Sequence, residues 1–146
     1  MTFVADRPLY GASWGAAIVR VFQKYATFRG RASPSEYWWW VLTGILVTTA
    51  INVLASATGV DPWQGGTLAL PPFGNAAGAV TSVPGVIALI WGLGTLLPSL
   101  AVTWRRLHDT DRSGAWFFLF LVPLVGWIVL IVFLAGSPRD EGARFD

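Results

Sequence analysis

The stretch Thr103-Trp104-Arg105-Arg106-Leu107-His108-Asp109-Thr110-Asp111-Arg112-Ser113-Gly114-Ala115-Trp116 stands between two long runs that lack charged side chains. It holds five charged residues and the only histidine of the chain. The run before it, 62–104, and the run after it, 113–138, contain no charge. Runs of this length without charge are typical of membrane-spanning segments. The stretch therefore predicts a polar connection at a membrane surface between two transmembrane helices.

The composition supports a membrane location for a single domain of 146 residues. Hydrophobic residues make up 54% of the chain and charged residues 12%, against about 25% charged in soluble proteins. A net charge of +2 without a basic stripe argues against nucleic-acid binding. The chain has no cysteine, so it forms no disulfide. Its first residues lack the apolar core of a signal peptide, so we expect no cleavable signal peptide.

The first part of the chain predicts a flexible cytoplasmic start over residues 1–12, followed by an amphipathic helix over 13–28 with Ser13 as its N-cap. Either this helix lies in the membrane interface with Arg20 and Lys24 toward lipid phosphates, or it packs on the protein itself. Its expected apolar face comprises Trp14, Ile18, Val21, Tyr25 and Phe28, and its polar face Arg20, Gln23, Lys24 and Thr27.

Two spans are predicted next, over 37–57 and 85–104, since each is long enough to cross a hydrocarbon core of ~30 Å. Ser33, Pro34 and Glu36 form a capping box that begins the first span. Trp38, Trp39 and Trp40 indicate an aromatic belt at headgroup depth. The Gly- and Pro-rich connection 59–84 is either loosely ordered or contains a short interfacial piece around 68–70.

Each predicted span carries one stripe of small polar residues at helical spacing. We expect the stripes to face each other and to form interhelical hydrogen bonds. Asn52 is alternatively a polar site in a transport path. The stripes are Thr48, Asn52 and Ser56 in the first span and Thr95, Ser99 and Thr103 in the second.

A third hydrophobic segment, 115–135, is interrupted by Pro123 and Gly126. It is therefore either a kinked span or a re-entrant hairpin. We expect the tail 136–146, which has mixed charge, to be mobile. The two alternatives place this tail on opposite sides of the membrane, so the sequence leaves its side open.

Lysine and arginine counts give the orientation: five precede the first span, none lies between the first and second, and three follow the second before the third segment. The N-terminus and the charged stretch are therefore predicted to be cytoplasmic, with Glu36 paired to an arginine. The alternative is that these residues only anchor the helix ends. The predicted interface cluster comprises Arg29, Arg31, Glu36, Arg105, Arg106, His108, Asp109, Asp111 and Arg112.

Catalytic and metal-binding motifs are missing from the sequence. One histidine without cysteine argues against a zinc site, and there is no Gly-x-Ser-x-Gly elbow, Walker motif or dinucleotide motif. The sequence thus predicts no catalytic residue, cofactor or metal.

Three motifs together resemble a known family: residues 25–38 (Tyr25-Ala26-Thr27-Phe28-Arg29-Gly30-Arg31 through Glu36-Tyr37-Trp38), residues 105–114, and Pro123-Leu124-Val125-Gly126. The chain resembles the bacterial inner-membrane proteins of the domain-of-unknown-function 805 family, over roughly Trp14 to Phe145. This resemblance implies a small multi-pass protein of the bacterial inner membrane, without an assigned reaction, substrate or cofactor.

The sequence thus predicts an all-α integral membrane protein with three hydrophobic helices and an N-terminal amphipathic helix. The leading functional hypothesis is a non-enzymatic accessory protein whose basic, tryptophan-rich cytoplasmic interface binds anionic lipid headgroups, a membrane-protein partner or further copies of itself. One alternative is an oligomeric transporter with a path along Asn52, Thr95 and Ser99. Another is an interfacial enzyme that acts on lipid headgroups through Glu36, His108 and Asp109.

Overall fold

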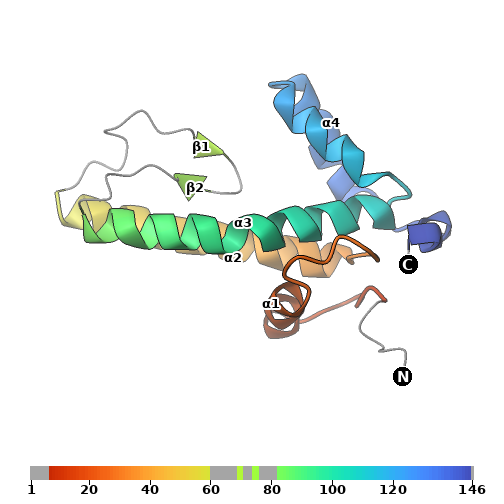
Figure 1. Ribbon diagram of the computed structural model, residues 1–146, viewed down its shortest axis with the longest axis horizontal. Helices are drawn as coiled ribbons and strands as arrows, with labels where there is room; N and C mark the ends of the chain where they lie inside the picture. The colour runs from red at the N-terminus through yellow and green to blue at the C-terminus, as the bar shows by residue number, and fades with distance from the viewer. Residues whose placement is uncertain (1–6, 60–68, 71–73, 76–81, 146) are drawn as a thin grey trace. The chain divides into compact units, whose positions relative to one another are not determined.

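The computed structural model describes residues 7–59, 69–70, 74–75 and 82–145 (Figure 1). A two-residue antiparallel ladder joins β1 (Ala69–Leu70) to β2 (Gly74–Asn75). The described helices are α1 (Trp14–Gln23), α2 (Pro34–Ala57), α3 (Val83–Asp109), the 3-10 helix η1 (Gly114–Leu121), α4 (Val125–Ala135) and the 3-10 helix η2 (Asp140–Phe145).

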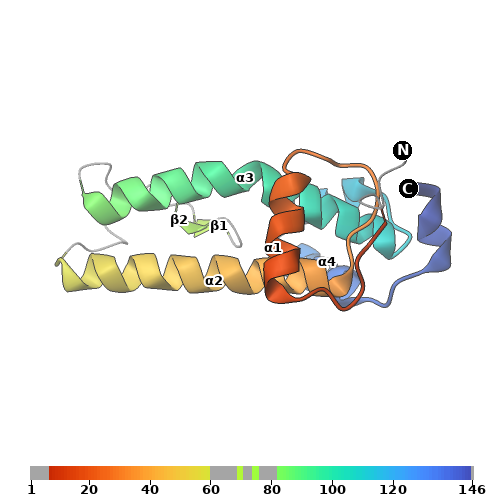
Figure 2. The same ribbon diagram turned by 90° about the horizontal axis from the view of Figure 1, so that it is seen from below.

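The chain divides into two compact units. The first unit comprises Met1–Trp40 and Leu100–Asp146, and the second comprises Val41–Ser99. In the second unit, the remainder of α2 and the first part of α3 run side by side in opposite directions (Figure 2). The first unit contains every charged residue that the structure describes.

Among the described residues, α2 and α3 are the two helices long and apolar enough to cross a membrane. They have 24 and 27 residues, and at 1.5 Å per residue each exceeds a ~30 Å hydrocarbon core. Their outward side chains are large and apolar, as at Ile45, Val53 and Ile90, which are 57%, 63% and 66% exposed. Such surfaces suit lipid and not water.

The third hydrophobic segment folds into two packed helical arms, η1 and α4, which we call the hairpin. The 3-10 helix η1 ends at Leu121, and α4 begins at Val125 after a turn in which Leu124 has φ 62°. Pro123 cannot donate a backbone hydrogen bond, which favours the break. Gly126 lies so close to the Leu119 carbonyl that a Cβ there would overlap it. The two arms therefore pack tightly against each other.

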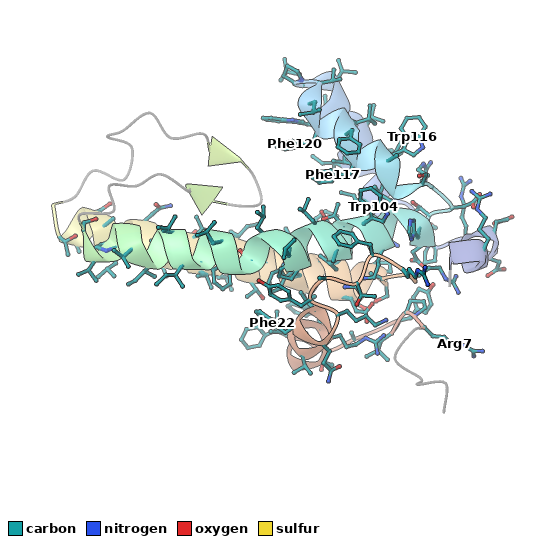
Figure 3. All side chains as sticks on the ribbon, in the orientation of Figure 1. Arg7, Phe22, Trp104, Trp116, Phe117 and Phe120 are labelled. Atoms are coloured by element: carbon teal, nitrogen blue, oxygen red, sulfur yellow. The ribbon has the colours of Figure 1, made fainter. Side chains whose placement is uncertain are left out.

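The amphipathic helix α1 is shorter than the predicted 13–28, and its orientation differs from the lipid-phosphate alternative. Ser13 caps it as predicted, accepting a hydrogen bond from the Ala16 amide at 3.5 Å. Its buried side includes Val21 and Lys24, whereas Trp14 and Phe22 are exposed. Figure 3 labels the Phe22 side chain on this helix. Lys24 thus packs on the protein, while Trp14 is exposed and Phe22 contacts the Trp40 ring edge-on.

Candidate functional site

The predicted capping box begins α2 and is confirmed. The Glu36 amide donates to the Ser33 hydroxyl at 3.2 Å, and the Ser33 amide donates to a Glu36 carboxylate oxygen at 2.9 Å. These reciprocal bonds satisfy two amides at the helix start that have no intrahelical partner. They also fix the Glu36 carboxylate, which is 2% exposed, inside the protein.

Glu36 pairs with an arginine, as expected, but with one outside the predicted cluster. The Arg20 Nε of α1 donates to a Glu36 carboxylate oxygen. Arg20 also donates from Nη2 to the Arg7 carbonyl at 2.6 Å. The helical spacing placed Arg20 on the polar side of its helix but did not predict that it would contact Glu36. This ion pair attaches α1 to the start of α2.

The predicted flexible start, 1–12, is held in place over the part that the structure describes. The Ala12 amide donates to the Ser35 hydroxyl at 3.0 Å, and the Ala12 carbonyl accepts from the Trp39 indole at 3.0 Å. The Ser33 hydroxyl donates to the Leu9 carbonyl at 2.6 Å. The arm before α1 is therefore fastened to the first turns of α2.

Asp109, which is fully buried at the end of α3, is a second charged centre. Its carboxylate accepts a hydrogen bond of 2.8 Å from the Tyr10 hydroxyl and one of 2.5 Å from Arg106 Nη1. Arg31 Nη1 lies 4.0 Å from the same carboxylate. Partial burial of the phenol, and secondly its bond to this carboxylate, raise the pKa of Tyr10 to about 12.

Arg106 uses all three guanidinium nitrogens within the protein. Besides its bond to Asp109, Nε donates to the Leu134 carbonyl at 2.9 Å and Nη2 donates to the Gly136 carbonyl. These carbonyls lie at the end of α4, where helix carbonyls lack intrahelical partners and a cation is favoured. Arg106 is therefore a clamp between α3 and the end of the hairpin.

A backbone contact joins the loop before α2 to α3. The Ala32 amide donates to the Arg105 carbonyl at 3.1 Å, and His108 Nδ1 lies 3.1 Å from the Gly30 carbonyl. His108 is buried and its Nδ1 thereby meets a backbone oxygen. This contact holds His108 of α3 against the loop that precedes α2.

Arg105 is 1% exposed, and its environment is unusual for a guanidinium. Its Nε donates to the Ala101 carbonyl at 3.3 Å, one turn back along α3. Within the described part of the chain, its buried Nη2 has no hydrogen-bond acceptor. Glu36 supplies the nearby negative charge and Arg20 a nearby positive one. A buried donor without an acceptor is costly, so this nitrogen favours an added oxygen ligand.

The remaining members of the predicted interface cluster lie at its edge. Asp111 pairs with Arg144 of η2 at 3.0 Å, so the predicted mobile tail is attached here. The guanidinium of Arg112 lies 3.9 Å above the Phe133 ring, and its partial burial lowers its pKa. Arg29 is exposed.

Hydrogen bonds of three members of the polar stripes can be described. Ser56 and Thr95 donate to the carbonyls of Asn52 and Trp91 in their own helices, at 2.9 and 2.6 Å. Thr103 forms an interhelical hydrogen bond, with the Tyr37 hydroxyl. Of the other stripe members, Thr48 and Asn52 are half-buried and Ser99 is buried.

The two charged centres form what we call the basic cluster: Arg20, Arg31, Glu36, Arg105, Arg106 and Asp109. It has four cationic side chains and two carboxylates. Lys24, which the sequence placed either toward lipid phosphates or against the protein, is 6% exposed. An excess of buried positive charge is unfavourable and attracts an anion. In the described ranges, no three His, Cys, Asp or Glu side chains gather as metal ligands do.

Comparison with known proteins agrees with this organisation. Residues 25–146 match the family described as a protein of unknown function, DUF805. The chain belongs to the DUF805 family. The match includes the loop before α2, the end of α3 and the hairpin, and so most of the basic cluster.

Two relatives within Escherichia coli (strain K12) are named inner membrane proteins. YhaH is 39% identical over 125 residues, covering 84% of this chain and 88% of its own. YhaI is 40% identical over 125 residues, covering 86% and 87%. The uncharacterized protein YiiR is 31% identical over 107 residues, covering 71% of this chain and 53% of its own. No solved structure matches the chain significantly.

Proposed function

We propose that this protein is a non-enzymatic component of the bacterial inner membrane whose basic cluster binds the phosphate groups of anionic lipids. It crosses the membrane with α2 and α3 and has its N-terminus in the cytoplasm. The observation that carries the proposal is the excess of cations in the basic cluster, together with the buried Arg105 Nη2 that lacks an acceptor among the described residues. A lipid phosphate oxygen supplies both a negative charge and an acceptor.

The orientation follows from the distribution of basic residues. All of the Lys and Arg residues lie before α2 or from Arg105 onward, and none lies between α2 and α3. Basic residues accumulate on the cytoplasmic side of inner-membrane proteins. The basic cluster thus belongs at the cytoplasmic surface, where anionic headgroups produce a negative potential.

The exposed side of α1 supports a position beside headgroups. Trp14, Val19 and Phe22 are 53%, 53% and 46% exposed, whereas Arg20 is partly buried in its pair with Glu36 and Lys24 is buried. Aromatic and aliphatic side chains that point away from the protein suit the boundary between headgroups and acyl chains. We therefore place α1 in the interface, next to the lipids that its neighbours bind.

The three groups of the interfacial-enzyme hypothesis have separate partners in the structure. Glu36 meets Arg20 and the Ser33 amide, His108 meets the Gly30 carbonyl, and Asp109 meets Tyr10 and Arg106. The contacts of Glu36 with Arg20, of His108 with Gly30 and of Asp109 with Tyr10 each join two segments of the chain. This engagement favours a structural use of the three groups and supports the non-enzymatic proposal.

Mass spectrometry of the lipids retained by the purified protein tests the proposal. The protein is extracted in mild detergent and exposed to equal amounts of phosphatidylglycerol and phosphatidylcholine. We expect wild type to retain more phosphatidylglycerol than phosphatidylcholine. We expect Arg105→Lys to lower this ratio at least several-fold, because lysine lacks the planar fork of donors. Equal retention of both lipids by wild type would refute the proposal.

A matched variant separates specific binding from general charge. Arg144→Gln removes one positive charge, which Arg105→Lys keeps, at an arginine that is 63% exposed and paired with Asp111. We expect it to retain phosphatidylglycerol as wild type does. A loss of this preference in Arg144→Gln without a loss in Arg105→Lys would mean that net charge alone attracts the lipid.

A further inference from the structure

The hairpin formed by η1 and α4 has both of its ends fixed to the same end of α3. At its start, Gly114 lies against the Trp104 ring so closely that no Cβ would fit. At its end, Arg106 binds the carbonyls of Leu134 and Gly136. The chain then continues into the tail, whose Arg139 amide donates to the Asp109 carbonyl at 2.9 Å. Both ends of the hairpin therefore lie beside the last turns of α3.

The hairpin surface is apolar on nearly every side. No charged residue occurs over 113–138. Leu121 and Leu124 near the turn are 76% and 73% exposed, and Ile128 and Val132 of α4 are 62% and 61% exposed. The buried side of α4 is a narrow stripe of Gly126, Leu130 and Leu134. A protein partner covers one face of a helix, whereas apolar residues all round are typical of a helix surrounded by lipid.

The length of each arm matches half of a bilayer. The eight residues of η1, at about 2.0 Å each, reach about 16 Å. The eleven residues of α4, at about 1.5 Å each, also reach about 16 Å. A hydrocarbon core is ~30 Å thick, so one leaflet contributes about 15 Å. Each arm is too short to cross the membrane and long enough to reach its midplane.

Aromatic side chains mark the base of the hairpin as its polar boundary. Trp116 and Phe133 form an edge-to-face pair with centroids 5.5 Å apart, and Arg112 stacks on Phe133. In Figure 3, the side chains of Phe117 and Phe120 follow from Trp116 along the hairpin. Aromatic rings with adjacent cations are typical of the headgroup boundary. Beyond them the hairpin presents only uncharged side chains.

We propose that this hairpin is a re-entrant anchor that inserts among the acyl chains of the cytoplasmic leaflet and returns to the cytoplasm. The proposal rests on membrane insertion of α2 and α3, but not on headgroup binding by the basic cluster. It places the C-terminal tail and all ten Lys and Arg residues on the cytoplasmic side. A third span would instead separate Arg139 and Arg144 from the other eight.

The absence of cysteine allows a direct test with single-cysteine variants. Ser113→Cys and Ser137→Cys mark the two ends of the hairpin, and Thr58→Cys at the far end of α2 is the matched control. A membrane-impermeant maleimide is applied to inside-out and right-side-out vesicles. We expect Ser113→Cys and Ser137→Cys to react only in inside-out vesicles, and Thr58→Cys only in right-side-out vesicles. Reaction of Ser137→Cys from the same side as Thr58→Cys would show a third span and overturn the proposal.

The depth of the turn is measured with a spin label on Leu121→Cys in reconstituted vesicles. We expect frequent collisions with oxygen and rare collisions with a water-soluble nickel chelate, at a depth near the bilayer centre. Frequent collisions with the chelate would place the turn in water. Spin–spin coupling between copies, together with loss of oxygen access, would show that a second copy covers the hairpin. Either of these results would overturn lipid insertion.

Discussion

The Tyr10 hydroxyl donates a 2.8 Å hydrogen bond to the Asp109 carboxylate, across 99 residues of sequence. Asp109 is fully buried, while about half of the Tyr10 surface is exposed. The bond therefore closes the N-terminal arm over the end of α3. It brings the segment before α1 to a charge that also holds Arg106.

Removal of this hydroxyl isolates the contribution of the bond. We expect Tyr10→Phe to lower the free energy of unfolding in detergent by about 1 kcal/mol, since the ring remains half-exposed and the carboxylate keeps Arg106. In a double-mutant cycle with Asp109→Asn, the two changes should cost less together than the sum of their separate costs. Strict additivity would mean that the hydroxyl does not interact with the carboxylate.

The same bond predicts a pH dependence in the alkaline range. The pKa of Tyr10 is raised from 10.0 to about 12, so the folded protein favours the neutral phenol. This contribution to stability is fully present below pH 10 and is lost as the pH rises toward 12. The difference in tyrosinate absorbance between wild type and Tyr10→Phe should therefore show a transition near pH 12 and not near 10. A transition at the ordinary value of a free phenol would contradict the hydrogen bond.

Gly114 lies in close contact with the Trp104 ring of α3. A Cβ there would overlap the Trp104 ring, so Gly114→Ala requires the hairpin or the ring to move. We expect a loss of about 1–3 kcal/mol in unfolding free energy, as in overpacked cores. Gly15→Ala is the control, because a Cβ at Gly15 of α1 meets nothing within 4 Å. That variant should be neutral or more stable, since alanine is the better helix former. Equal effects of the two variants would show that Trp104 tolerates the methyl group.

The sequence predicted the features that depend on local spacing. Ser33 and Glu36 are three residues apart, and this spacing alone specifies their reciprocal capping bonds. The apolar helices α2 and α3 follow from charge-free runs longer than a bilayer core is thick. Hydropathy is the same for a kinked span and for two packed arms, so the sequence left both alternatives open for the third hydrophobic segment.

Pairings between residues far apart in the chain could not be predicted from the sequence. Arg20 binds Glu36 and Tyr10 binds Asp109 because the arm before α2 folds back, and no local pattern encodes that path. Periodicity identified the two sides of α1 but not which one faces the protein. The buried Glu36 carboxylate attracts Arg20, while Trp14 and Phe22 remain 53% and 46% exposed. Electrostatics thus decided an orientation that hydrophobicity left open.

The ion pair of Arg106 and Asp109 provides the strongest prediction about stability. Both side chains have no exposed surface, and the two are 2.5 Å apart at positions i and i+3. Removing one partner leaves a buried charge without its counter-charge, which costs about 3–5 kcal/mol. We expect Arg106→Met to lose about that much unfolding free energy, and also to release the end of α4, because the carbonyls of Leu134 and Gly136 lose their donor.

The double variant Arg106→Met with Asp109→Leu distinguishes loss of an ion pair from loss of packing. Because it removes both charges, it should be more stable than Arg106→Met alone, although the helix-end bonds remain absent. Asp111→Asn is the matched control, since its pair with Arg144 is 23% and 63% exposed and is worth less than about 1 kcal/mol. Chemical unfolding in detergent measures all three variants. If Asp111→Asn lost as much unfolding free energy as Arg106→Met, burial of the pair of Arg106 and Asp109 would add nothing to its strength. The proposed anchoring of α4 by Arg106 would then be wrong.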